Sequence, residues 1–404
     1  MPKDLPATIP VRLNPETSVV KPETVPPSPT SKAALLPPAK SPSLSAPALP
    51  AMTVPRADLA VFVRFASRLA SRAPMPALRC SLFSFESAIV TDLDVALRER
   101  LPGVRDIGVL VPVAVLKRCL LIREASEVRI ERSPSVLERP FMFAIGGAVF
   151  AGHDPAEFPS IAALFPTTEP MARAKFATLE AVLVATSNDE TRKSFCAVFF
   201  QLCRNLAVAT NGHVLHTTEI LSGDEGDFLV PRSAIELVEN IRKATKTPQV
   251  EVCFFEHQAV FRVGRFEIAS RLETDKFPAW EEVLPKESKY ELRMSKVALL
   301  DALDQIGAAV GDRSRGIRLR RIVEGLEIRG DNPDAGTMTT VVDASGWKEG
   351  EMIGMNLAYL YNAARFARSD ELRIGITHQN SPLMIHDGPY FACVMSMRVK
   401  GDEQ

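Results

Sequence analysis

The chain has 404 residues, of which 46% are hydrophobic and 24% are charged, and its formal net charge is −1. This composition is that of an ordinary globular protein, and the length is enough for two to four domains. A net charge near zero excludes a protein coated uniformly in positive charge, although it does not exclude a basic patch on one face. The six cysteines form no CxxC pair, so the sequence indicates neither a zinc site nor a disulfide framework.

Residues 1–55 differ from the rest of the chain. They hold 14 of the 31 prolines, and no aromatic residue appears before Phe62. Such a segment buries too little apolar surface to offset the entropic cost of ordering it, so we expect a disordered, Pro-rich tail. It lacks the layout of a signal peptide, and no apolar run in the chain reaches membrane-spanning length. We therefore expect a cytoplasmic protein that does not bind a membrane.

From residue 56 onwards the pattern repeats. The stretch LVPVAVLKRCL at 110–120 returns 119 residues later as LVPRSAIELVENI at 229–241, and IGMNLAYLYNAARF at 353–366 has the same shape. Each predicts a short apolar strand that leads into a helix, and in the first two a proline stands where the helix begins. An amphipathic helix is predicted to open each unit, at residues 57–71, 171–186 and 295–309.

Short strands bounded by turns fill the rest of each unit. Residues 249–273 are typical of a three-stranded meander, and residues 321–332 of two strands joined at Gly325. A period this long predicts three domains rather than a solenoid. The predicted fold class is α+β, with two helices on one face of an antiparallel sheet in each domain. The expected domains are 56–165, 166–287 and 288–404.

Two Phe-Pro pairs, at residues 158 and 277, also lie 119 residues apart. The sequence around them, AEFPSI at 156–161 and DKFPAW at 275–280, ends the first and the second unit. We interpret both stretches as connectors between domains, with apolar side chains that pack at the junction.

Four stretches, in order along this repeat, resemble the bacterial sliding clamp, the beta subunit of DNA polymerase III. KFPAWEEVLP at 276–285 is similar to that family's connector between its second and third domains, and VATNGHVLHT at 208–217 is similar to its Ala-Thr-Asp-Gly-His-Arg-Leu turn. SRGIRLR at 314–320 resembles a third-domain strand, and YFACVMSMRV at 390–399 resembles the closing run. The resemblance covers about residues 56–400, and the Pro-rich tail has no counterpart in it.

The resemblance implies an architecture and a role. Two protomers would pair head to tail as a homodimer, so that six domains close a ring with helices lining the hole around duplex DNA. The protein would not be an enzyme and would need no cofactor. It would tether DNA polymerase III and other proteins with a clamp-binding motif, and a separate ATP-driven clamp loader would place it on DNA.

The residues themselves offer a test of DNA binding. Arg64, Arg68 and Arg72 recur every fourth residue, which places three guanidinium groups in one stripe of a helix. A solvated helix face is the alternative, but it would normally intersperse acids. Further candidates on predicted helices are Lys117, Arg118, Arg173, Lys175, Arg242, Lys243, Arg365 and Arg368. Contacts to phosphates would make binding sequence-independent and salt-sensitive.

The pair Arg242 and Lys243 admits a second interpretation, because cations at the end of a helix also complement its dipole. The sequence does not decide between this role and contact with DNA.

The resemblance also implies a groove for partner peptides between the second and third domains. The positions that match the motifs are Phe195, Thr210, Gly212, His213, Val214, Leu215, Pro278, Val283, Leu383, Val394, Met395, Ser396 and Met397. Met395 and Met397 fit such a role independently, because flexible thioethers suit a surface that accepts several partners. Ordinary strand packing is the alternative for both.

Three departures from the family pattern lie in this set. Val214 and Glu282 stand where the family usually has arginine, and Ser396 stands where it has proline. They motivate an alternative hypothesis: a clamp-like paralogue with altered partners, such as a specialised polymerase, a repair route or tolerance to an inhibitor. A metal site at His213 and His216 is not expected, because residues three apart in a strand point to opposite faces.

Overall fold

The computed structural model describes residues 49–121, 125–135, 139–310, 315–332 and 336–398. Residues 1–48, for which the sequence predicts a disordered tail, lie outside these ranges. No helix among the described residues is long and apolar enough to cross a membrane.

One order of ten elements, β-α-β-β-β-β-α-β-β-β, occurs three times along the chain. The first repeat is β1 (Ala51–Pro55), α1 (Arg56–Arg72), β2 (Cys80–Ser84), β3 (Ser87–Thr91), β4 (Val95–Arg100), β5 (Val111–Pro112), α2 (Val113–Cys119), β6 (Glu127–Ser133), β7 (Met142–Ile145) and β8 (Ala148–Ala151). The second repeat is β9 (Ala172–Phe176), α4 (Glu180–Leu183), β10 (Ala197–Gln201), β11 (Leu206–Thr210), β12 (Val214–Glu219), β13 (Asp227–Pro231), α5 (Arg232–Thr245), β14 (Val250–Phe254), β15 (Gln258–Val263) and β16 (Phe266–Arg271).

The third repeat is β17 (Tyr290–Ser295), α6 (Lys296–Ala309), β18 (Gly316–Ile322), β19 (Gly325–Asn332), β20 (Gly336–Val342), β22 (Met352–Asn356), α7 (Leu357–Arg365), β23 (Glu371–Ile376), β24 (Leu383–Asp387) and β25 (Tyr390–Val394), with the short β21 (Ala344–Ser345) added. Two connectors join the repeats. The first contains the one-turn helix α3 (Ile161–Leu164), and the second contains a 3-10 turn at Trp280–Val283.

Each repeat forms two antiparallel sheets. In each sheet, the strand before one helix pairs with the strand after the other helix. The strand before the first helix pairs with the strand after the second helix: β1 with β6, β9 with β14 and β17 with β23. The strand before the second helix pairs with the strand after the first: β5 with β2, β13 with β10 and β22 with β18. The predicted α+β class is therefore confirmed, with two sheets rather than one in each repeat.

Neighbouring repeats join edge to edge. Strand β4 pairs with β16, and β12 pairs with β25, so the sheets merge into one of eight strands and one of nine. Two four-stranded sheets remain in the described part of the chain, one with β1 and β8 at its ends and the other with β20 and β22 at its ends. We call the β4–β16 and β12–β25 pairings the first and second seam.

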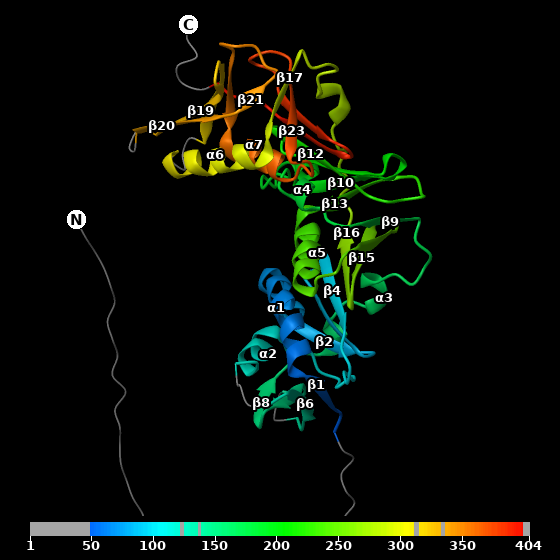
Figure 1. The fold of residues 1–404 in the computed structure, drawn as a ribbon. Coiled ribbons are helices and arrows are strands. Elements are labelled where there is room, and N and C mark those ends of the chain that lie inside the picture. The colour runs from blue at the N-terminus through cyan, green and yellow to red at the C-terminus, as the bar shows by residue number, and fades with distance from the viewer. Residues whose placement is uncertain (1–48, 122–124, 136–138, 311–314, 333–335, 399–404) are drawn as a thin grey trace, which may run out of the picture. The chain divides into compact units, whose positions relative to one another are not determined.

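The helices pack in pairs on one face of the sheets, α1 against α2, α4 against α5 and α6 against α7. In α1 the buried residues Leu59, Phe62 and Ala66 recur every three or four positions, which is the pattern of an amphipathic helix. The main hydrophobic core lies beneath these helices. The helices predicted at 57–71 and 295–309 are confirmed as α1 and α6 (Figure 1).

Two expectations about elements were wrong. Residues 51–55, assigned to the tail, form β1, in which Met52 and Val54 are buried where the strand pairs with β6. Residues 171–186 are not one helix but strand β9 followed by the short helix α4. In β9 the alternation of buried Ala172, Ala174 and Phe176 with exposed residues has period two, and the sequence VATSND after α4 is poor in helix formers.

Candidate functional site

The arginine stripe of α1 lies on the exposed side of the helix. Arg64, Arg68 and Arg72 are all exposed, and none of them makes an ion pair with another described residue. The acid on this helix, Asp58, accepts a hydrogen bond from Arg265 Nη1 at 2.6 Å, so its charge is already balanced. The stripe therefore presents three uncompensated positive charges.

Helix α2 packs against α1 and extends this basic surface. Lys117 and Arg118 lie in its last turn, are exposed, and form no ion pair within the described residues. The described part of the first repeat thus carries five free cations on its helix pair.

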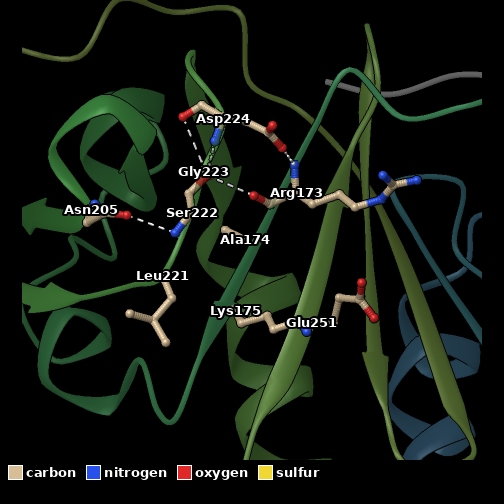
Figure 2. Close-up of a pocket in the computed structure, with 9 residues that line it drawn as sticks. All are labelled: Arg173, Ala174, Lys175, Asn205, Leu221, Ser222, Gly223, Asp224 and Glu251. Atoms are coloured by element: carbon tan, nitrogen blue, oxygen red, sulfur yellow. Dashed lines mark hydrogen bonds between the residues drawn. The ribbon is translucent and has the colours of Figure 1, made fainter.

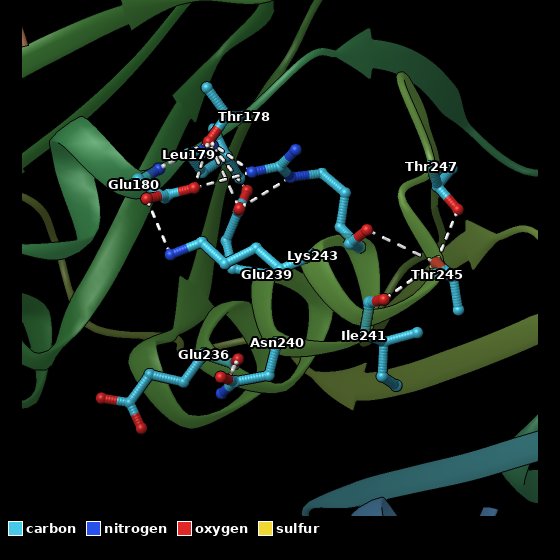
Figure 3. A network of polar contacts seen from close by, with 11 residues as sticks. Thr178, Leu179, Glu180, Glu236, Glu239, Asn240, Ile241, Lys243, Thr245 and Thr247 are labelled. Atoms are coloured by element: carbon cyan, nitrogen blue, oxygen red, sulfur yellow. Dashed lines mark hydrogen bonds and ion pairs between the residues drawn. The ribbon is translucent and has the colours of Figure 1, made fainter. Parts of the chain in front are cut away.

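The corresponding cations of the second repeat are paired. Arg242 on α5 lies between two carboxylates, with Nε 2.8 Å from Glu239 Oε2 and Nη2 2.7 Å from Glu180 Oε1. Lys243 Nζ lies 2.8 Å from Glu180 Oε2. Because Glu239 is almost fully buried and also accepts from the backbone N–H of Leu179, this network holds α4 onto α5 (Figure 3). Arg242 therefore has a structural role, because it joins carboxylates of α4 and α5.

Of the two predicted cations of the third repeat, one forms an ion pair within the described residues. Arg365, the last residue of α7, stacks its guanidinium 4.5 Å from the centre of the Phe366 ring. Arg368 lies after the helix and pairs with Glu219 at 3.9 Å. On α6 the exposed side chains include Asp301 and Asp304, so this face offers little positive charge.

Arg173 and Lys175 do not lie on a helix. Both are exposed residues of the edge strand β9 and point away from the core that buries their neighbours, so they lie on the sheet face opposite the helices. They line a shallow, open pocket of about 420 Å³ with Ser222, Asp224 and Glu251 (Figure 2). Arg173 is paired with Glu169 at 2.9 Å. The structure thus separates these two residues from the α1 stripe.

The predicted partner residues gather around a tight turn between β11 and β12. Thr210 Oγ1 donates to the carbonyl of Val214 at 2.8 Å and accepts from the N–H of Gly212 at 3.1 Å. The side chain of Asn211 accepts from the N–H groups of both His213 and Val214. Gly212 has φ +89°, a conformation that glycine adopts without strain. The Asn-Gly pair thus explains why the chain turns here.

This turn is attached to the C-terminal strand of the third repeat. Val214 faces Val394 across the second seam, and the N–H of Met395 donates to the carbonyl of His213 at 2.8 Å. Leu383 faces Val394 from the other side. The N–H of Met397 donates to the carbonyl of Gly354, which places Met397, with Ser396, beside β22.

Tyr359 on α7 contacts the turn between β11 and β12 and so adds to the contact between the second and third repeats. The sequence analysis did not identify this residue. Its ring stacks on His213 with 6.3 Å between ring centres, and its hydroxyl accepts from the side-chain amide of Asn211 at 3.4 Å. The ring of Phe195 lies on the other side of the turn, 3.8 Å from where a Cβ on Gly212 would stand. No motif in the sequence points to Tyr359.

Strand alternation divides the predicted partner residues between the two faces of the seam. Val214 and Val394 face the inner core and are at most 3% exposed, so they are removed from any ligand surface. Leu215 and its seam neighbour Cys393 face outward, where they pack with Phe277 and Trp280 of the connector. Cys393, rather than Val394, therefore belongs to the outer cluster, because successive side chains of a strand point to opposite faces.

The second connector covers this outer cluster and leaves two predicted residues exposed. Phe277 stacks on Phe199 with 4.8 Å between ring centres, and Trp280 lies beneath the guanidinium of Arg204. Pro278 is exposed and Val283 is 73% exposed. Met395 and Met397 are exposed as well. We call the exposed Val283, Met395 and Met397, together with Leu215 and Cys393, which are buried beneath the connector, the partner surface.

His213 and His216 point in different directions, as strand alternation predicts. His216 is fully buried, its Nδ1–H donates to the carbonyl of Ala181 at 2.7 Å, and rings of Phe366 and Tyr390 pack around it. Burial lowers the pKa of His216 to about 4, and the bond to Ala181 offsets this only in part. His216 is therefore a neutral packing residue at the contact between the second and third repeats.

Comparison with known proteins shows what the chain is similar to. Residues 281–397 match the family model of the DNA polymerase III beta subunit, C-terminal domain. The beta sliding clamp of Pseudomonas putida is 25% identical over 216 residues, which are 52% of this chain and 58% of that protein. The beta sliding clamp of Escherichia coli is 26% identical over 185 residues, 45% of this chain and 50% of its own. The chain thus aligns with little more than half the length of these curated relatives.

Solved structures extend the likeness to the whole fold. A sliding clamp from Bartonella birtlesii, bound to griselimycin, has a TM-score of 0.75 and 22% identity, and covers 86% of this chain and 100% of its own. A sliding clamp from Pseudomonas aeruginosa has a TM-score of 0.73 at 21% identity, with the same coverage. By domain match, by sequence and by fold, the chain is similar to bacterial beta sliding clamps.

Proposed function

We propose that this protein is a DNA sliding clamp, a homodimeric ring that encircles duplex DNA in the cytoplasm and tethers DNA polymerase III and other proteins. The role is mechanical, so it needs no catalytic residue. The observation that carries the proposal is the pairing of sheet edges between successive repeats.

The two seams follow one rule. Each joins the last strand of a first-half sheet, β4 or β12, to the last strand of a second-half sheet in the next repeat, β16 or β25. The remaining strand of each type is β20 in the third repeat and β8 in the first, and each is a terminal strand of its four-stranded sheet. Terminal strands expose backbone donors and acceptors that favour pairing with another chain. Pairing β20 of one protomer with β8 of its partner would repeat the rule and close a ring of six modules.

The charge distribution supports contact with DNA on the helix side. The five free cations of α1 and α2 offer phosphate contacts without a base-reading motif, so binding would be sequence-independent. Enclosure rather than affinity would keep such a ring on DNA, which suits a protein that must slide.

The partner surface supports tethering. It combines a buried apolar floor, Leu215 and Cys393, with the exposed side chains of Val283, Met395 and Met397. An apolar floor with flexible thioethers at its rim suits extended peptides from several partners.

A test of topology separates a clamp from a protein that merely binds DNA. The chain, a clamp loader and ATP are mixed with a nicked circular plasmid, and retention is measured by gel filtration before and after the plasmid is cut once. Retention on the circle and release from the linear form are expected. Equal retention on both, or a monomer in solution, would contradict the proposal.

A paralogue with altered partners is the second candidate, and the charge of the second connector favours it. Glu281 and Glu282 are both exposed; Glu281 is paired with Arg204, whereas Glu282 has no ion pair within the described residues. No cation therefore flanks Val283 from the connector's own turn. A ring that passes the plasmid test but fails to hold DNA polymerase III would favour this second candidate.

A further inference from the structure

One residue of the first connector, Ile161, lines a pocket. The equivalent residue of the second connector is the buried Trp280. The two stretches FPSIAALFP (158–166) and FPAWEEVLP (277–285) align residue for residue at an offset of 119. Phe158 and Phe165 are buried on the outer face of the first seam, as Phe277 is on the outer face of the second. Ile161 stands where the second connector has Trp280.

The same offset relates the surroundings of these two residues. Ile89 and Val208 lie at equivalent positions of β3 and β11, and both belong to the outer clusters. Arg204, which lies over the Trp280 ring at 5.8 Å, belongs to the turn between β10 and β11, and the shorter turn between β2 and β3 holds Phe85 and Glu86. The outer face of the second seam is therefore filled by an indole ring beneath a guanidinium group, and the first seam has a smaller side chain at the position of that ring.

A pocket of about 230 Å³ opens at this position, with Ile89 and Ile161 among its lining residues. Its other lining residues are Ser84, Phe85, Glu86, Ser87, Arg98 and Arg100. This volume is below the ~300 Å³ at which pockets for drug-sized ligands begin, and it leaves room for a single side chain. Arg98 is paired with Glu267, whereas Arg100 is exposed and has no ion pair within the described residues.

The turn that forms one wall is strained and presents an aromatic ring. Phe85 and Glu86 have φ +49° and +54°, so two residues with side chains occupy left-handed positions that a two-residue hairpin normally fills with Asn-Gly. Phe85 is nonetheless 87% exposed. Strain of this kind concentrates at binding sites, and an exposed ring beside a pocket that two isoleucines and two arginines also line offers a stacking partner.

We propose that this pocket binds an aromatic side chain, tryptophan above all, presented by a peptide segment of a partner protein. The ring would occupy the place that Trp280 occupies in the second connector, stack against Phe85 and receive cation–π contact from Arg100. The inference rests on the two connectors and not on the proposed function. A single side chain binds weakly, so the isolated residue is expected to have a dissociation constant on the order of 1 mM.

Saturation-transfer NMR on the full chain tests this proposal with N-acetyl-tryptophanamide as the probe. Saturable transfer to the indole protons is expected, with at least a threefold weaker signal for N-acetyl-leucinamide at the same concentration. Ile161→Trp supplies the ring from the chain itself and is expected to abolish the signal. Ala163→Trp, which adds the same residue at an exposed neighbouring position, should leave it unchanged.

A second variant distinguishes specific loss of binding from loss of the folded structure. Phe85→Asn with Glu86→Gly supplies the residues that the turn favours, so it should raise the melting temperature and still weaken the indole signal severalfold. Absence of transfer in the wild type, an unchanged signal in Ile161→Trp, or equal transfer to leucinamide would each overturn the proposal.

Discussion

Glu99 and Arg265 meet across the first seam, with Arg265 Nε 2.5 Å from Glu99 Oε1. Glu99 is fully buried on β4, and Arg265 lies in the turn before β16, from which it also reaches Asp58 on α1. One guanidinium group of the second repeat thus holds a strand and a helix of the first. Burial raises the pKa of Glu99 to about 8, although Arg265 acts in the opposite direction.

The first prediction concerns this carboxyl. Its pKa is higher in the folded protein than in the unfolded chain, so its contribution to stability is complete below about pH 4.5 and is lost as the pH rises through about 8. Glu99→Gln, which cannot ionise, should remove up to about 1.4 kcal/mol per pH unit from the pH dependence of the unfolding free energy in this window. Urea unfolding at pH 5 and pH 8 measures it. Identical slopes for wild type and variant would show that Glu99 ionises normally.

The second prediction concerns His216, for which the sign is reversed. Its folded-state pKa is lowered from 6.5 to about 4, so the unfolded chain takes up a proton first and stability falls as the pH drops from 6.5 toward 4. The loss between pH 6.5 and 5 should be roughly 2 kcal/mol. His216→Leu should lack this component. The exposed His257→Leu is the matched control and should retain it in the same urea titration.

The third prediction locates the DNA contact. Changing Arg64, Arg68 and Arg72 together to Glu should weaken binding of the dimer to any duplex and lower the slope of log K against log salt by up to roughly 3 for each protomer, because about 0.9 counterion is released per phosphate. Arg173→Glu with Lys175→Glu changes charge on the sheet face opposite the helices and should have little effect. Fluorescence anisotropy across a salt series distinguishes the two. Equal effects from both sets would place DNA elsewhere.

Ring closure is the subject of the fourth prediction. Val149 on β8 is 52% exposed in the protomer, so Val149→Lys should leave the melting temperature of the monomer unchanged. A lysine at the proposed β8–β20 contact should raise the dimer dissociation constant at least tenfold, because charged residues on an edge strand oppose pairing. Val323→Lys, in the exposed turn before β19, is the control. Sedimentation equilibrium that detects no difference between the variants would exclude this edge.

The partner surface yields the fifth prediction. Griselimycin, which is bound to the clamp from Bartonella birtlesii, serves as the probe. Val283→Ser with Met395→Ser should weaken its binding at least tenfold while the melting temperature is maintained, because both side chains are exposed. Calorimetric titration measures this. If the wild type forms a ring and does not bind the compound, the altered paralogue is favoured over the standard clamp.

Sequence periodicity predicted much of the fold, because repeated strand-to-helix steps leave a pattern that does not depend on distant contacts. It failed at 171–186, where ARAKF alternates as a strand over only five residues and the following helix has a single turn. It failed also at β1, because a strand of five residues between prolines is specified by its pairing with β6 rather than by its own sequence.

The candidate site was predicted in part. The motif located the turn at Thr210–Leu215 because Asn-Gly has a local conformational signature. It did not reveal that Arg242 is held by Glu180 and Glu239, since Glu180 comes from another helix. Nor did it separate Val394 from Cys393, because a one-residue difference in strand register reverses which side chain faces outward.

The seams have one more consequence. Five residue pairs join β4 to β16 and four join β12 to β25, and such joins are made by peptide groups that every amino acid carries. Mutation can replace the side chains on either side without removing these backbone hydrogen bonds. During evolution the surface charges, the connectors and the bound proteins can therefore change while the pairing of strands between successive repeats is retained.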